Sequence, residues 1–205
     1  YSNTHVFTQV FNQPDRFGGD EKFAEGLVNR LSILSAAPTS QKDTGSAPYV
    51  KTSVFGGGDI KDSIWNFSGM SAPIKILQDN TYGVGVTVST PPLPDTPNFD
   101  GTVRSAPLIV SANDQIYPSV ALETLRAFYD QPNYQTRVTP EVGIEWIRMG
   151  RQPPIETTST SDVMITYWND FDRISASDLT EKTLHGHDGI SDKILIWGMT
   201  AEGFN

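Results

Sequence analysis

Proline and glycine are spread along the whole chain, and they limit the length of any helix or strand. The 205 residues include 14 prolines and 17 glycines. Proline lacks the backbone N–H that a helix interior or a central strand needs, and glycine is favoured where the chain turns. Hydrophobic residues make up 37% of the chain and charged residues 19%, both low for a long helical protein. The pattern therefore favours many short strands joined by turns.

Alternation of apolar and polar residues predicts the strands. From Tyr82 to Val88 every second residue is tyrosine or valine, and the residues between them are glycine or threonine. Such alternation is typical of a half-buried antiparallel strand, and the small residues on its other face leave room for a ligand, a neighbouring subunit or a second packed layer. Further strands are expected over 4–11, 49–55, 74–77, 102–111, 134–138, 142–148, 162–168 and 193–199. For 134–138 and 142–148 a helix is the alternative, because Thr139-Pro140-Glu141 fits a helix start, and strands are favoured.

Two segments have the spacing of amphipathic helices. In the first, apolar residues from Phe23 to Leu34 are separated by four, four and three positions, which places them on one helical stripe. Acidic residues precede Phe23 and suit the positive end of the helix dipole. We expect this helix to continue until Pro38 stops it. The second helix follows Pro118 and ends near Phe128, with apolar residues on one side.

The order of these elements predicts the fold class. About nine strands and two helices occur without a repeating strand–helix order, and no internal repeat is visible. We expect one β-rich domain over residues 1–205, an antiparallel β-sandwich of jelly-roll-like type with about two short helices. The proline-rich segment 91–97 is expected to cross one end of the sandwich as a long connection.

Charge and cysteine content exclude several classes of protein. The formal net charge is −9, so the average surface repels nucleic acids and anionic lipid headgroups. The absence of cysteine removes disulfides, thiolate nucleophiles, iron–sulfur clusters and cysteine-based zinc sites. No run approaches the roughly 18 apolar residues of a membrane span. We therefore expect no direct contact with nucleic acid and none with a membrane.

A stretch of His-Gly-His-Asp-Gly begins at His185 and contains two of the three histidines. On an extended segment, His185 and His187 would face the same side, where neutral imidazoles bind zinc, iron, manganese or copper, and Asp188 would add an oxygen. A cupin-type metal site would also need a carboxylate soon afterwards and a distant histidine. The next glutamate is Glu202, and the remaining histidine is His5. An ordinary glycine-rich turn is therefore favoured, with His185, His187 and Asp188 as the metal-ligand candidates.

A second acidic group follows the strand expected over 162–168. Asn169, Asp170, Asp172 and Asp178 offer oxygen ligands for a hard cation such as Ca²⁺. Their spacing lacks the central glycine and terminal glutamate of an EF-hand loop. A solvated turn is the favoured interpretation.

Two glutamate pairs are candidates for glycoside hydrolysis, which uses two carboxylates at a defined separation. These are Glu141 with Glu145, and Glu123 with Glu156. Surface charge is the simpler interpretation of both pairs. No GxSxG nucleophile motif is present, so serine hydrolase chemistry is not expected.

No catalytic set is convincing, so the favoured hypothesis is a structural assembly protein that is not an enzyme and needs no cofactor. We expect a viral capsid or virion subunit that buries apolar patches against copies of itself or related subunits. The start at Tyr1 suggests processing, which suits a virion or extracellular location. One alternative is an extracellular carbohydrate-binding or carbohydrate-active sandwich with an exposed tryptophan, and a weaker one is a cupin-like metalloenzyme.

Overall fold

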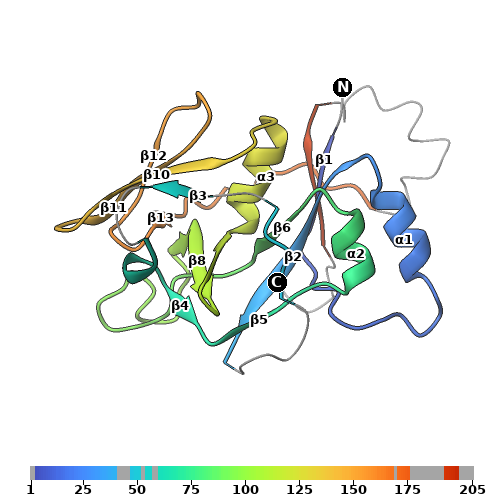
Figure 1. Cartoon of the computed structure of the whole chain (residues 1–205), viewed down its shortest axis with the longest axis horizontal. Coiled ribbons are helices and arrows are strands. Elements are labelled where there is room, and N and C mark those ends of the chain that lie inside the picture. The colour runs from blue at the N-terminus through green and yellow to red at the C-terminus, as the bar shows by residue number, and fades with distance from the viewer. Residues whose placement is uncertain are drawn as a thin grey trace.

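The protein is mostly β with few helices, and its strands form mixed sheets (Figure 1). The computed structural model describes residues 3–40, 47–51, 54–56, 60–168, 170–175 and 192–198. Within these ranges the strands belong to four sheets, of five, four, three and two strands. The prediction of a β-rich chain with short elements is confirmed. The jelly-roll sandwich is not, because parallel strand pairs dominate the largest sheet.

The largest sheet joins the two ends of the described chain. Its strands are β1 (Thr4–Phe7), β2 (Leu31–Thr39), β5 (Gly69–Ser71), β6 (Gly83–Val86) and β14 (Ile194–Trp197). β1 lies between β14 and β2 and is parallel to both, and β6 is parallel to β2. Only β5 pairs antiparallel, at the end of β2. Parallel neighbours need crossover connections, so these strands cannot be the hairpins of an antiparallel sandwich.

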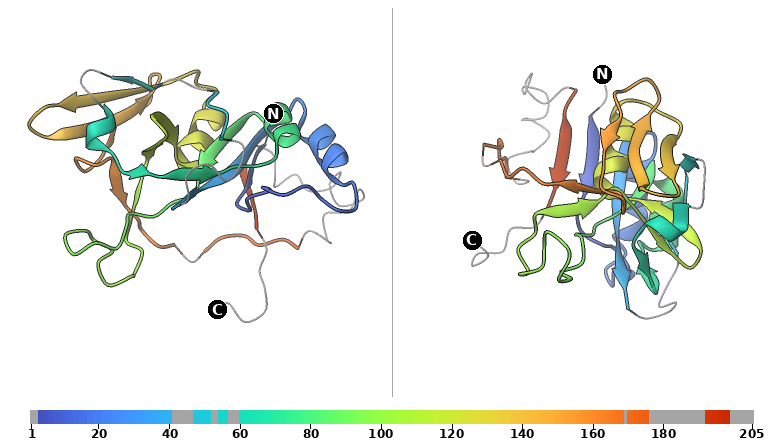
Figure 2. Two further views of the ribbon diagram at one scale, coloured as in Figure 1. Left: turned by 60° about the horizontal axis from the view of Figure 1, so that its bottom comes forward. Right: turned by 90° about the vertical axis from the view of Figure 1, so that its left-hand side faces the viewer.

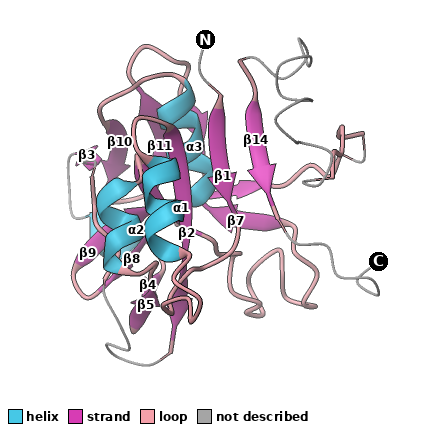
Figure 3. Ribbon diagram, turned by 90° about the vertical axis from the view of Figure 1, so that its right-hand side faces the viewer, coloured by secondary structure: helices cyan, strands magenta, loops and turns pink. Residues whose placement is uncertain are grey.

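Helices cover both faces of this sheet (Figures 1 and 3). α1 (Asp20–Leu27) and α2 (Lys75–Asn80) lie on one face, where Leu27 and Leu77 pack with Leu34 of β2. α3 (Val120–Phe128) lies on the other, begins at the predicted position and is capped by the Ser119 hydroxyl, which accepts from the Leu122 N–H. α2 replaces the strand expected over 74–77. Helices on both faces are the usual environment of parallel strands.

The first predicted helix is wrong in its second half. α1 ends at Leu27, and the chain turns through Asn29, whose φ of 58° lies in the left-handed region. Ser32 to Ala36 then form the buried part of β2, with Ile33 and Leu34 both fully buried. The spacing of Leu31 and Leu34 fits a helix stripe, but a strand buried on both faces has apolar residues at every position and satisfies the same spacing.

The glycines of β6 face helix α3. A Cβ on Gly85 would lie 2.4 Å from Val120 Cα, and a Cβ on Gly83 would lie 2.1 Å from the Glu123 carboxylate. Helix α3 therefore packs directly on the backbone of β6. The second packed layer, rather than a ligand or another subunit, explains the small residues between the valines.

The other three sheets lie beside α3, on the side away from α1 and α2 (Figure 1). The strands expected over 134–138 and 142–148 are confirmed as β10 (Tyr134–Thr139) and β11 (Gly143–Met149), which pair as an antiparallel hairpin. The short partners of this hairpin are β3 (Val54–Gly56) and β12 (Ile155–Glu156). The remaining short elements are η1 (Ile60–Ser63), β4 (Asn66–Phe67), β7 (Ser105–Pro107), β8 (Ile109–Ala112), β9 (Gln115–Pro118) and β13 (Asp162–Met164). Their main core contains Ile109, Leu122, Tyr134, Ile144 and Ile147, all fully buried.

The proline-rich segment is a long connection between β6 and β7, as expected. A buried amide and a buried carboxylate hold its two ends. The Asn98 Nδ2 donates to the carbonyl oxygens of Thr90, at 2.8 Å, and Ser105, at 3.0 Å. The Asp162 carboxylate accepts from the Thr90 hydroxyl at 2.6 Å and from the Trp65 indole at 3.1 Å. These polar groups fix a loop that contains no helix or strand.

Candidate functional site

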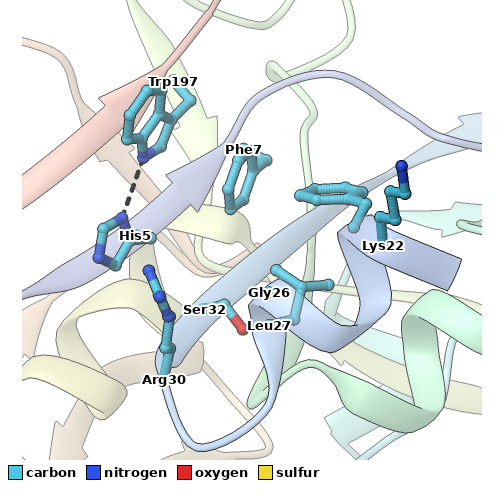
Figure 4. Close-up of a pocket in the computed structure, with 9 residues that line it drawn as sticks. His5, Phe7, Lys22, Gly26, Leu27, Arg30, Ser32 and Trp197 are labelled. Atoms are coloured by element: carbon cyan, nitrogen blue, oxygen red, sulfur yellow. Dashed lines mark hydrogen bonds between the residues drawn. The ribbon is translucent and has the colours of Figure 1, made fainter. Parts of the chain in front are cut away.

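A pocket opens where the first and last described strands meet helix α1 (Figure 4). Its volume is about 240 Å³. It is lined by His5 and Phe7 of β1, Ser32 of β2, Trp197 of β14, and Lys22, Phe23, Gly26, Leu27 and Arg30 of α1 and the turn after it. Segments almost 200 positions apart along the chain, at His5 and Trp197, thus form one site (|i−j| = 192).

Aromatic rings form one side of the pocket. Phe7 and Trp197 are stacked, with ring centroids 6.0 Å apart and an interplanar angle of 11°. Phe23 meets Phe7 edge to face, with centroids 5.2 Å apart. Such ring pairs hold each other in place and present a flat apolar surface. Leu27, which is buried in α1, extends this apolar side.

A hydrogen bond joins the two outer strands inside the pocket. The Trp197 Nε1–H donates to His5 Nδ1 at 3.1 Å (Figure 4). Indole is a donor only, so Nδ1 of His5 must be the unprotonated nitrogen and the imidazole carries its proton on Nε2. Partial burial and the nearby Arg30 guanidinium lower the pKa of His5 below its usual value. The imidazole is therefore neutral near pH 7, with Nε2–H left as a donor.

Two cations at the pocket have no partner within the described ranges. Lys22 and Arg30 are exposed, and neither side chain makes an ion pair or hydrogen bond to another described residue. Among the described residues, no aspartate or glutamate lines the pocket. The Ser32 hydroxyl is already engaged with the Thr81 hydroxyl at 3.1 Å. In a chain of net charge −9, this is a local positive region beside open space.

The predicted metal ligands His185, His187 and Asp188 lie outside the described residues, so the metal site remains a prediction. Within the part of the chain that is described, no group of three His, Asp or Glu side chains is placed to hold a metal ion. The third histidine considered as a ligand, His5, uses Nδ1 to accept from the Trp197 indole.

Glu123, considered as a catalytic carboxylate, belongs to a closed cluster in the core. Arg126 donates to both of its carboxylate oxygens, at 3.0 and 2.7 Å, and the Tyr134 hydroxyl donates to one of them. Burial, and next the neighbouring Glu123 carboxylate, raise the pKa of Tyr134, so the phenol keeps its proton. Glu156 is exposed on β12 and does not join the cluster. The two residues do not form a catalytic pair.

The other acidic candidates are surface groups. Glu145 of β11 forms an ion pair with Arg137 of β10 at 3.1 Å, and Glu141 lies in the turn between those strands. Asp170 and Asp172 are exposed, and their predicted companions Asn169 and Asp178 lie among the residues not described.

The sequence did not point to Lys22 or Arg30 as site residues. Arg30 was expected inside a helix, whereas it lies in the turn that leads from α1 into β2. Trp197 was correctly placed in the last strand, but nothing local in a sequence reveals that this strand pairs with the first. Asn29 was the available signal that the helix ends before Arg30, because asparagine tolerates the left-handed backbone of a turn.

The fold and the pocket define a mixed-sheet domain with a small pocket at the edge of its main sheet. The chain belongs to the CHASE2 domain family, whose model matches residues 5–205. CHASE2 domains are extracellular sensor domains, typically of signalling proteins such as cyclase and kinase receptors. No curated protein and no solved structure matches the chain.

The family corrects the hypothesis about function. The viral capsid or virion subunit is wrong, because the chain belongs to a family of signalling sensors. The carbohydrate-active and cupin-like alternatives are overturned by the same finding. The extracellular part of the expected location is confirmed, and the virion is not supported. Of the helices described, none has the length and hydropathy needed to cross a membrane.

Proposed function

We propose that this domain senses a small molecule that binds in the pocket formed by β1, β14 and α1. The observation that carries the proposal is the position of Trp197, which lines the pocket and donates a hydrogen bond to His5 of the neighbouring strand. An occupant would touch α1 and both strands at once. Pockets of mainly apolar lining with a few polar groups are the usual sites for small ligands.

The same position offers a way to pass the signal on. β14 lies at the edge of the main sheet, where its described strand partner is β1. An edge strand held on one side is among the less stable parts of a fold, so contacts to an occupant can change how firmly it docks. A ligand that binds the docked state better than the undocked state shifts the population towards docking. The occupied pocket thus fixes β14 against β1.

A blocked pocket tests this proposal. Gly26 lines the pocket on α1, and a Cβ at this position meets no atom within 4 Å. Gly26→Leu should fill the opening without disturbing the backbone, and Gly26→Ala is the matched control with a small side chain. A library of small molecules is screened by thermal unfolding, and hydrogen exchange of β14 is measured with each hit. We expect hits that stabilise wild type and Gly26→Ala, protect β14 and leave Gly26→Leu unchanged.

Two results would count against the sensing pocket. One is a screen whose hits all stabilise Gly26→Leu as much as Gly26→Ala. The other is a set of pocket-dependent hits that leave hydrogen exchange in β14 unchanged, which would remove β14 as the element that reports occupancy.

We also propose that copies of this chain contact one another through the exposed segment of residues 164–168 and 170–174. Tyr167, Trp168 and Phe171 are 68%, 66% and 66% exposed, although large aromatic side chains normally avoid water. The segment is extended in Figure 2. Exposed apolar patches commonly mark protein contacts, and most homo-oligomers are two-fold dimers. The acidic net charge makes nucleic acid or anionic lipid poor occupants.

Light scattering tests this contact. Wild type should form dimers at high concentration, and the double variant Trp168→Ser with Phe171→Ser should be monomeric. Phe17→Ser is the control, since Phe17 is 95% exposed in a different part of the chain. A monomeric wild type, or a dimer that survives the double variant, would refute the contact.

A further inference from the structure

We infer that the pocket takes a small organic carboxylate with a single flat apolar group. This inference rests on the proposed sensing function and adds the chemical class of the ligand. It follows from three properties of the lining: which polar groups are free, what shape the apolar side has, and how much space remains.

The free polar groups of the pocket are donors or cations. Lys22 and Arg30 are unpaired among the described residues, and His5 keeps its Nε2–H because Nδ1 accepts from Trp197. Figure 4 shows Arg30 next to the His5 ring and Lys22 at the other end of the pocket. None of the lining side chains that the structure describes is acidic. Such a set offers a ligand mainly donors and positive charge and favours an anion, for which charge-assisted hydrogen bonds are the strongest.

Arg30 and Lys22 have different parts in this inference. Arg30 and the neutral His5 imidazole are side by side, and a guanidinium binds the two oxygens of a carboxylate in a planar fork. We assign the carboxylate to this end. Lys22 carries a compact charge on a flexible stem, which suits attraction of the anion more than its orientation.

The apolar side selects a flat group. Phe7 and Trp197 present stacked rings, and Phe23 closes the side towards α1. An aromatic or other planar ligand gains contact area against such a surface and loses little conformational freedom. A purely inorganic anion would leave these rings exposed to water.

The volume limits the size of the ligand. The pocket measures about 240 Å³. Pockets for drug-sized ligands begin at roughly 300 Å³. A ligand of one ring and one carboxylate matches a pocket of this size.

Benzoate and benzamide provide a matched pair of probes, since they have the same shape and differ in charge. Binding to the whole domain is measured by isothermal titration calorimetry near neutral pH. We expect benzoate to bind wild type and Gly26→Ala but not Gly26→Leu, and benzamide to bind at least about tenfold more weakly than benzoate. Inorganic phosphate, which lacks the apolar group, should bind more weakly than benzoate as well.

Charge variants locate the anion. Arg30→Gln should weaken benzoate binding by about tenfold or more, as expected for a lost charge-assisted bond, and Lys22→Gln should weaken it less. Arg16→Gln is the control, because Arg16 is exposed and does not line the pocket. If Arg30→Gln binds benzoate as wild type does, the carboxylate does not lie at Arg30 and the inference is wrong.

The outcomes separate this inference from the proposed function. Equal binding of benzoate and benzamide, both lost in Gly26→Leu, would reject the carboxylate and leave the sensing pocket intact. Benzoate binding that persists in Gly26→Leu would reject both. If benzoate and phenylacetate both fail to bind wild type, the ligand class is wrong, and the library screen alone decides the sensing function.

Discussion

The charged side chains on the two faces of the main sheet differ in burial and in their hydrogen-bond partners. On the α3 face, Arg126 is almost completely buried and donates to Glu123, to the Tyr82 hydroxyl and to the Gln131 carbonyl. On the α1 face, Lys22 and Arg30 are exposed and unpaired within the described chain. The charges on the α3 face are therefore neutralised inside the protein, whereas those on the α1 face are available to a ligand.

This contrast separates a structural role from a binding role. A buried ion pair is tolerated only when its hydrogen bonds are completed, and a completed cluster has nothing left to offer a ligand. Exposed cations beside an apolar pocket contribute little to the fold and remain free to bind an anion. Substitutions on the α3 face should therefore change stability, and substitutions on the α1 face should change binding.

The largest effect is expected from Glu123→Ala. It removes the carboxylate that neutralises Arg126 and accepts from Tyr134, leaving a buried guanidinium without its counter-charge. Breaking a buried pair in this way costs about 3–5 kcal/mol in the free energy of unfolding. Urea unfolding measures it, with Glu156→Ala as the exposed control. A loss below about 1 kcal/mol would show that the cluster does not hold the fold.

A pair of glycine variants sharpens the contrast between packed and open faces. Gly85→Ala places a Cβ 2.4 Å from Val120 Cα, so helix α3 must move, at a cost of about 1–3 kcal/mol. Gly26→Ala meets no atom within 4 Å and should instead stabilise α1 by about 0.5–1 kcal/mol. Thermal and urea unfolding check both signs. A stabilising Gly85→Ala would contradict the close packing of α3 on β6.

The pH dependence of stability reports on His5. Its pKa is lowered in the folded state by burial and by Arg30, so the unfolded chain binds the proton more tightly. Stability from this group is present above the unfolded-state pKa of about 6.5 and is lost as pH falls through that value towards the folded-state pKa. His5→Asn, which keeps an acceptor for Trp197, should lose less stability between about pH 7.5 and about pH 5.5 than wild type. Equal losses in urea unfolding would disprove the assignment.

The smallest effect on stability is expected from Lys22→Gln. The side chain is exposed and unpaired among described residues, so the free energy of unfolding should change by less than about 0.5 kcal/mol. Urea unfolding checks it against wild type. A loss larger than about 1 kcal/mol would mean that Lys22 supports the fold, and the contrast between the faces would fail.

The parts of the fold that depend on local pattern were predictable. The hairpin of β10 and β11 follows from alternation and a short turn, and α3 follows from its apolar stripe after Pro118. Leu31 and Leu34 misled because a fully buried strand and a helix stripe share their spacing. The β1–β14 pair was not predictable, since its register depends on packing between the two ends of the chain.

The pocket was not predictable from the sequence for the same reason. Each lining residue is ordinary in its own segment, and the site exists only because β14 docks beside β1 and α1 covers them. The stretch at His185, by contrast, attracted attention because its two histidines are close in sequence. Proximity along the chain is visible in a sequence, whereas proximity between distant strands is not.

The most direct test of the ligand pocket is a titration followed at the Trp197 indole. Its Nε1–H bonds to His5 inside the pocket, so its resonance in a ¹H–¹⁵N spectrum reports on that site alone. Benzoate should shift this signal to saturation in wild type and Gly26→Ala, with no shift in Gly26→Leu. A Trp197 signal that stays in place while benzoate binds would contradict the account.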